Sequence, residues 1–260
     1  MTDPPKFHYV TFYTEDLKEQ EVAHREGVRE HVNTFTAFSR DDVITMGGEE
    51  YVRCFDDVHA LPHNPGLHKC GMGAWKPFIL LKILTEREDV MDGDIIMYRD
   101  VNVKKYPYYL WGVPGFRGLA EEVLNEVGCD VFMPAEGTHL TIPQHCKMQV
   151  VRELGVRDMG VSEKDICEYP LLIANMLLVR KSAESVAILQ EWLEAVGHHE
   201  WLLPSPNENP HPSFKWHTPE QGVFSVLCAC KVSKGELPKD YPKYLFSDRI
   251  FQKDKQVKCR

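Results

Sequence analysis

The fold class is decided by residues 71–107, GMGAWKPFILLKILTEREDVMDGDIIMYRDVNVKKYP. WKP at 75–77 opens a helix, because proline is tolerated in a first turn where its missing N–H would have no partner. Apolar side chains then recur at helical spacing over 78–84. MDGD at 91–94 breaks the helix, and IIMY at 95–98 is typical of a buried central strand. We therefore expect a helix, an acidic turn and a buried strand.

Two oxygen-bearing side chains follow this strand directly, in Asp100-Val101-Asn102. In an open α/β sheet, the crevice at the carboxyl ends of the strands is where ligands bind. Carboxylate and amide oxygens suit Mg²⁺ or Mn²⁺ that also grips a diphosphate. The alternative is an ordinary Asx turn after a strand.

Composition indicates an ordinary globular chain. It has 260 residues, 43% hydrophobic and 27% charged, which is enough for one large α/β domain with a sizeable core. The net charge is −9 and the pI is about 5.7. Nucleic acid is therefore not expected as a partner, since phosphate-backbone binding depends on clustered Lys and Arg.

The cysteines favour a reduced, cytoplasmic protein. There are eight, with no Cys-x-x-Cys pair, and the chain has no Asn-x-Ser/Thr acceptor site. The start, MTDPPKFHYV, has no apolar core of the kind a signal peptide needs. The longest nearly apolar run, 170–179, is too short for a membrane span.

The beginning of the chain reads as strand, helix and strand. Aromatic and β-branched residues over 7–13 predict the first strand, and Thr14-Glu15-Asp16 starts a helix over about 16–32. Residues 35–44 are expected to form a second strand with its turn. Gly71 and Gly73 are expected to let the backbone approach a ligand or another strand closely.

The later part of the chain has a second set of strong signals. Residues 171–179 predict a buried strand with Asn175 in its middle, followed by an amphipathic helix. A proline-rich segment, 197–219, is expected to be an ordered functional loop. HTPEQG then starts a helix with Glu220 in its first turn, where its charge complements the helix dipole. Further elements are expected at 117–127 (helix), 129–133 (strand), around 145–155 (helix) and 244–246 (strand).

The helix that starts at WKP, followed by Gly-Asp-Ile-Ile-x-Tyr-x-Asp-x-Asn, resembles the middle of nucleotide-sugar glycosyltransferases of the GT-A type. In those enzymes the corresponding strand ends in Asp-x-Asp, which holds the metal and the sugar nucleotide; here the second acid is Asn102. The resemblance implies a mixed, mostly parallel Rossmann-like sheet flanked by helices in a single domain, 1–260. Its nucleotide-binding half would be about 7–110 and its acceptor half about 111–250. The chain is similar to the soluble glycosyltransferases of large algal viruses (chloroviruses), some of which transfer xylose.

The resemblance also implies a nucleotide and metal site. Asp100 and Asn102 would hold Mn²⁺ or Mg²⁺, with His217 or Asp248 as a third ligand. The loop at Thr14 and Glu15 would face the uracil and ribose, although a plain helix cap is an equal alternative. Lys76 and Arg99 are candidates for phosphate binding or for structural ion pairs.

The candidate catalytic residues lie at the start of the helix near residue 220. By the same resemblance, Glu220 would be the base and Gln221 a sugar contact, with Glu136 and Glu168 as alternative bases. Asn175 would hydrogen-bond a sugar hydroxyl, unless it is a buried Asn satisfied by backbone. The stereochemical outcome stays open.

The expected function is transfer of a hexose or pentose from a UDP-sugar to a hydroxyl of a glycan or glycoprotein. Asn102 also leaves room for a catalytically inactive carbohydrate- or nucleotide-binding protein of the same fold. A nucleotide-sugar hydrolase is the third reading. A Rossmann dehydrogenase is not expected, because no Gly-x-Gly-x-x-Gly follows the first strand.

Overall fold

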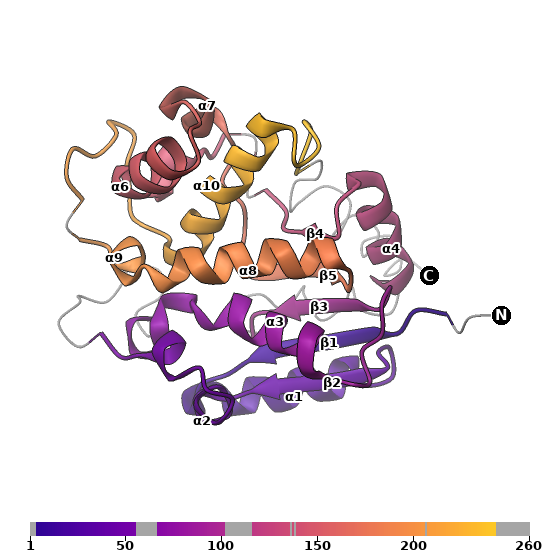
Figure 1. Cartoon of the computed structure of the whole chain (residues 1–260). Coiled ribbons are helices and arrows are strands. Elements are labelled where there is room, and N and C mark those ends of the chain that lie inside the picture. The colour runs from indigo at the N-terminus through magenta and orange to yellow at the C-terminus, as the bar shows by residue number, and fades with distance from the viewer. Residues whose placement is uncertain are drawn as a thin grey trace, which may run out of the picture.

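The chain forms a mixed α/β fold around a five-stranded sheet with the strand order β2-β1-β3-β5-β4 (Figure 1). The computed structural model describes residues 4–55, 67–101, 116–135, 137, 139–205 and 207–242. The strands are β1 (Phe7–Phe12), β2 (Thr34–Phe38), β3 (Ile95–Arg99), β4 (Val131–Phe132) and β5 (Met176–Arg180). β1 pairs in parallel with β2 and β3, whereas β5 runs antiparallel to β3 and β4. The expectation of a mixed sheet flanked by helices is confirmed.

Helices cover the sheet and extend beyond its β5–β4 side (Figure 1). The α-helices are α1 (Lys18–Val28), α2 (Arg40–Thr45), α3 (Trp75–Glu86), α4 (Phe116–Val127), α5 (Ile142–His145), α6 (Met148–Val150), α7 (Glu163–Glu168), α8 (Ala183–Gly197), α9 (His199–Leu202) and α10 (Pro219–Lys234). Short 3₁₀ turns are η1 (Glu15–Leu17), η2 (Glu49–Val52) and η3 (Leu67–Gly73), and a π-helix, η5, spans Val151–Asp158. None of the helices described has both the length and the apolar character needed to cross a bilayer.

The two faces of the sheet carry different helices. On one face, the ring of Phe12 stacks on Trp75 of α3 at 4.0 Å between centroids. On the other face, the hydroxyl of Tyr9 lies 3.2 Å from Nδ1 of His24 of α1. Successive residues of a strand point to opposite faces, which is why neighbouring β1 positions contact different helices. α8 packs beside α3, and α10 packs against α8.

The predicted helix–turn–strand core is confirmed, since α3 begins at Trp75 and β3 occupies Ile95–Arg99. Two expectations nearby are wrong. Over 35–44 only the first part is strand, because Ser39 and Asp42 form a capping box that starts α2. β5 begins at Met176, so Asn175 precedes the strand instead of lying in its middle.

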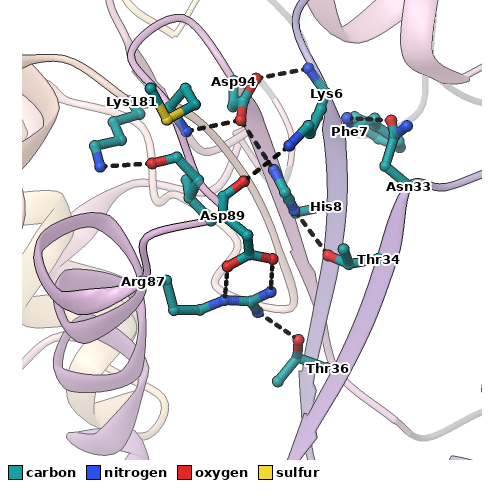
Figure 2. A network of polar contacts seen from close by, with 12 residues as sticks. Lys6, Phe7, His8, Asn33, Thr34, Thr36, Arg87, Asp89, Asp94 and Lys181 are labelled. Carbon is teal, nitrogen blue, oxygen red and sulfur yellow. Dashed lines mark hydrogen bonds and ion pairs between the residues drawn. The ribbon is translucent and has the colours of Figure 1, made fainter.

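Asp94 fixes the amino end of β3 (Figure 2). Its Oδ1 accepts a hydrogen bond from the backbone N–H of Lys6 at 2.6 Å, and its Oδ2 accepts from Met91 N at 2.8 Å. His8 Nε2 of β1 also lies 3.2 Å from Oδ2. Because these bonds join β1 to the turn before β3, they fix the position of the first residue of β3 relative to β1.

Candidate functional site

The candidate site lies at the carboxyl edge of the parallel strands, where β1 and β3 end and β5 begins. Asp100 follows β3 directly, and its backbone N–H donates to Asn175 O at 2.9 Å. Its Oδ1 accepts a hydrogen bond from the Tyr98 hydroxyl at 2.7 Å. The Asp100 side chain is 39% exposed, so it is held at one oxygen and still open to solvent. Burial, together with the charge of Asp100, raises the pKa of Tyr98, which therefore stays a hydrogen-bond donor.

Lys76, in the first turn of α3, lies at the centre of the site. Its Nζ donates to Glu220 Oε1 at 2.7 Å and to Ala174 O at 2.9 Å, and lies 3.4 Å from Asp100 Oδ1. Lys76 is only 4% exposed. Burial alone would lower the pKa of this amine, but the carboxylates of Asp100 and Glu220 more than offset it, so the pKa of Lys76 is raised. Lys76 is therefore a cation in the folded protein.

Glu220 and Gln221 enter the site from the first turn of α10. The Glu220 side chain is 6% exposed and pairs with Lys76. Its backbone carbonyl accepts from Trp192 Nε1 of α8 at 3.3 Å. Gln221 Oε1 accepts from the backbone N–H of Ala174 at 3.3 Å, which ties α10 to the segment before β5. Glu220 thus contacts Lys76 directly, and Gln221 contacts the backbone of Ala174, whose carbonyl also accepts from Lys76.

Gly71 and Gly73 lie in η3, just before α3, and both have positive φ values, +73° and +86°. A Cβ on Gly71 would lie 1.9 Å from the carbonyl oxygen of Tyr51, and one on Gly73 would lie 2.3 Å from Glu220 Cδ. Both glycines are closely approached, but by the η2 backbone at Gly71 and by the Glu220 carboxylate at Gly73, and not by the ligand or strand that was expected. No side chain larger than hydrogen fits at Gly73 while Glu220 keeps its place.

Asn175 stands directly before β5, next to the backbone of Ala174 that Lys76 and Gln221 hold. Its Oδ1 is buried and has no hydrogen-bond partner among the described residues. A buried amide oxygen without a partner is costly, and such atoms in functional sites often await a ligand or an ordered water. The alternative of a side chain satisfied by backbone therefore does not hold for this oxygen.

Thr14 and Glu15 lie at the same edge, at the end of β1. Thr14 Oγ1 donates to Asp16 Oδ1 at 2.5 Å, and Glu15 is exposed at the start of η1. Thr14 is the N-cap residue of η1 and its carbonyl accepts from Leu17 N at 2.8 Å, although its side chain makes no capping bond, so the helix-cap alternative stays open. Buried Cys70 of η3 feels the charges of Glu220, Lys76 and Asp16, with burial as the main cause that raises its thiol pKa to about 11. η3 thus lies between the end of β1 and the Lys76 site.

Two predicted residues lie away from this group. The Arg99 side chain is buried, and its charge acts on Tyr9 and His24, which lie on the α1 face of the sheet. His217 Nε2 bonds to Trp201 O at 2.8 Å, and its Nδ1 accepts from Lys147 N at 3.3 Å. Burial lowers the pKa of His217 to about 3. With both ring nitrogens bonded to backbone, His217 has none left for a metal.

Other candidates are outside the site or outside the described residues. Glu168 is exposed at the end of α7 and lies 3.9 Å from Lys164, so it does not join the Lys76 group. Asn102, Glu136 and Asp248 fall outside the described residues, as does the strand expected at 244–246. Across the part of the chain that the structure describes, no three His, Cys, Asp or Glu side chains gather as a metal site. Mg²⁺ often uses only one or two carboxylates together with substrate phosphates, which Asp100 fits.

Three groups that contribute to the site were not predicted from the sequence: the side chains of Tyr98 and Trp192 and the carbonyl of Ala174. For Tyr98 a signal existed, because residues two apart in a strand share a face and Tyr98 therefore points the same way as Asp100. For Trp192 and Ala174 there was none, since their contacts join segments 28 and 98 residues apart.

No protein-family model and no curated protein sequence matches the chain. Two solved structures of the galactosyltransferase LgtC match, one in complex with donor and acceptor sugar analogs and one of an active-site mutant. Their identities to this chain are 10% and 12%, each covers 85% of this chain and 70% or 69% of its own, and both TM-scores are 0.36. A likeness at this level does not establish a shared fold or a shared activity.

Proposed function

We propose that this chain is a glycosyltransferase of the GT-A type that moves a sugar from a UDP-sugar to a hydroxyl of a glycan or glycoprotein. The observation that carries the proposal is the convergence of Lys76, Asp100 and Glu220 at the carboxyl edge of the parallel strands. These residues come from α3, from the end of β3 and from α10. Ligand sites of open α/β sheets occur at this edge.

A divalent cation, Mn²⁺ or Mg²⁺, would be held by Asp100, which is half-exposed, and by Asn102, together with the diphosphate of the donor. When bound, the ion supplies Lewis-acid stabilisation of the negative charge on the leaving diphosphate. His217 is left out of the proposed ligand set because both of its nitrogens are bonded within the protein.

The remaining residues receive roles on the donor and acceptor. Thr14 and Glu15, beside the end of β1, would contact the nucleoside. The buried, unpartnered Oδ1 of Asn175 would accept a hydrogen bond from a sugar hydroxyl, with Gln221 next to it. Glu220 would accept the proton of the acceptor hydroxyl as general base. Arg99, buried on the α1 face, has no role in the proposed site.

Nucleotide binding is the first test. The unfolding temperature would be measured with UDP, GDP, UDP-glucose, UDP-galactose and UDP-xylose, each with and without Mn²⁺. A ligand at 100 times its Kd stabilises the fold by about 2.7 kcal/mol, which a thermal shift detects easily. We expect stabilisation by UDP-containing ligands that Mn²⁺ increases. If no nucleotide shifts the unfolding temperature, the proposed function is wrong.

Turnover then separates transfer from its alternatives. UDP release from a stabilising UDP-sugar would be followed with and without oligosaccharide acceptors, and the products analysed by mass spectrometry. Release that depends on an acceptor and yields an extended glycan supports a transferase. Release at the same rate without acceptor would identify a nucleotide-sugar hydrolase, and binding without any release would identify an inactive binding protein.

A further inference from the structure

Lys76 Nζ donates both of its hydrogen bonds among the described residues to groups of the protein itself, and it also forms an ion pair with Asp100. An ammonium group has three N–H donors. In the structure three acceptors surround Nζ, namely the Glu220 carboxylate at 2.7 Å, the Ala174 carbonyl at 2.9 Å and the Asp100 carboxylate at 3.4 Å. A phosphate contact would need one of these to be given up.

The ammonium is also enclosed by aromatic rings. Nζ lies 5.4 Å from the ring centroid of Trp75 and 5.7 Å from that of Tyr98, within the range of cation–π attraction. Trp75 and Tyr98 are themselves buried. A lysine that reaches for a ligand usually keeps a flexible, hydrated head, whereas this one is fixed on every side.

The acceptors of Lys76 come from three separate parts of the chain. Asp100 follows β3, Ala174 precedes β5, and Glu220 lies in the first turn of α10, while Lys76 itself belongs to α3. Glu220 is confined further by Gly73, where a Cβ would lie 2.3 Å from its Cδ. Asp100 has a second support in the Tyr98 hydroxyl at 2.7 Å, which does not depend on Lys76.

We infer that Lys76 is a positioning residue that fixes the distance between the Asp100 and Glu220 carboxylates, and that it does not contact the diphosphate of the donor. This inference rests on the proposed function and replaces phosphate binding as the role of Lys76. Asp100, held by Tyr98, would keep the nucleotide in place without Lys76. Glu220 would lose its alignment with the acceptor hydroxyl.

Two variants test the inference. Lys76→Met removes the ammonium, and Lys76→Met with Glu220→Gln removes both charges of the buried pair, so that the fold is kept if the single variant does not fold. Lys82→Met is the matched control, because Lys82 lies on the same helix and pairs with Glu86 at the surface. The Kd for UDP with Mn²⁺ would be measured by calorimetry, and kcat by UDP release.

We expect the Kd for UDP to change less than about threefold in both Lys76 variants, since no phosphate contact is lost. We expect kcat to fall about 100-fold or more in both variants, because the general base Glu220 is misplaced in the single variant and replaced in the double variant. Lys82→Met should leave both quantities unchanged. A folded double variant whose Kd rises about 30-fold or more would overturn the inference, as this is the loss expected for a charge-assisted contact to phosphate.

Amine acetylation of the wild-type protein gives a readout that does not need activity. With acetic anhydride and peptide mapping by mass spectrometry, Lys76 should stay unmodified with and without UDP, while Lys82, whose side chain is 29% exposed, reacts in both cases. Rapid acetylation of Lys76 that UDP prevents would overturn the inference. If the wild type binds no nucleotide, the proposed function fails, whereas an unreactive Lys76 still supports its role in holding the two carboxylates.

Discussion

The two ends of β3 carry the same residue type in opposite states. Asp94, before the strand, is almost completely buried, and both of its oxygens accept hydrogen bonds. Asp100, after the strand, is 39% exposed, and its described contacts, to Tyr98 and Lys76, both end on Oδ1. Both oxygens of Asp94 are bonded within the chain, whereas Oδ2 of the partly exposed Asp100 has no hydrogen-bond contact among the described residues.

The amino edge is a closed network (Figure 2). Asp89 forms a bidentate ion pair with Arg87, and Arg87 Nη1 also donates to Thr36 Oγ1 of β2 at 2.7 Å. Lys181, directly after β5, donates to Val90 O at 2.8 Å. Together with the contact of Asp94 to His8 of β1, these bonds connect the segment between α3 and β3 to β1, β2 and the end of β5. This network therefore has a structural role.

The burial of polar groups costs more stability at the carboxyl edge than at the amino edge. Lys76 and Glu220 are a buried ion pair, and such pairs repay their desolvation only with close geometry and further hydrogen bonds. Asn175 adds a buried oxygen without a partner in the described part of the chain. Polar groups whose burial lowers stability are expected where a protein binds or reacts. The contrast therefore favours a functional role for the carboxyl edge and a structural role for the amino edge.

The same substitution at the two ends of β3 gives the largest expected contrast. Asp100→Asn keeps an oxygen to accept from Tyr98 but removes the charge that would bind a cation. We expect kcat to fall about 1,000-fold, on the scale of losing a main electrostatic contribution. The free energy of unfolding should change by less than about 1 kcal/mol, because the side chain is partly solvated. Near-normal UDP release by this variant would remove Asp100 from the site.

Asp94→Asn should show the reverse. An amide presents one acceptor oxygen and one NH₂ donor, so it cannot accept from both Lys6 N and Met91 N. A buried N–H left without its charged acceptor predicts a loss of about 3 kcal/mol in unfolding free energy. Chemical denaturation measures that loss, and kcat per folded molecule should match the wild type. A stable but inactive Asp94→Asn protein would erase the distinction between the edges.

The local elements were predictable because their signals are local. WKP and the apolar spacing after it defined α3, and IIMY between a DG turn and a polar tip defined β3. Asp100 was identified as a site candidate from its place directly after the strand, whereas Lys76 and Glu220 were assigned through the resemblance to GT-A glycosyltransferases. The start of α2 was missed because the Ser39–Asp42 capping box was read as a turn within a strand.

The pairing of those candidates could not be predicted. Lys76 and Glu220 are 144 residues apart, and nothing in either local sequence indicates that they meet. The same limit applies to His217, which the resemblance offered as a third metal ligand, whereas packing buries it against Trp201 O. The reason for glycine at 73 was equally hidden, since it depends on where α10 places Glu220.

Alanine substitutions at two glycines, one at each edge, are expected to have effects of intermediate size. Gly73 and Gly93 have nearly the same backbone, φ +86° and +89°, and lie at the carboxyl and amino edges. A Cβ on Gly73 would meet Glu220, whereas a Cβ on Gly93 would have nothing within 4 Å. Both alanine variants bear the left-handed strain of about 1 kcal/mol. Gly73→Ala should lose at least about 1 kcal/mol more and most of its turnover, because Glu220 must leave Lys76.

Gly93→Ala is the control for backbone strain, and its turnover should stay at the wild-type level. Denaturation midpoints and UDP release would be measured on both proteins in parallel. Equal losses of stability and activity in the two variants would mean that the approach of Gly73 to Glu220 has no consequence.

The smallest expected effect is a pH dependence at the amino edge. Burial lowers the pKa of His8 below 6.5, although its bond to Asp94 partly opposes this. The unfolded chain therefore takes up a proton near pH 6.5 that the folded protein resists, so the contribution of His8 is present above pH 6.5 and is lost as the pH falls. The unfolding free energy should therefore fall as the pH is lowered from 7.5 to 5.5.

His8→Gln keeps an N–H that can donate to Asp94 and cannot titrate, so it should lose less stability over that interval than the wild type. His24 and His217, whose pKa values burial lowers to about 3, contribute equally to both proteins and cancel in the comparison. Asp94, with its pKa lowered below 3.8, adds nothing above pH 5. Parallel stability curves for the two proteins would show that His8 does not titrate on unfolding, and the amino edge would then be insensitive to pH.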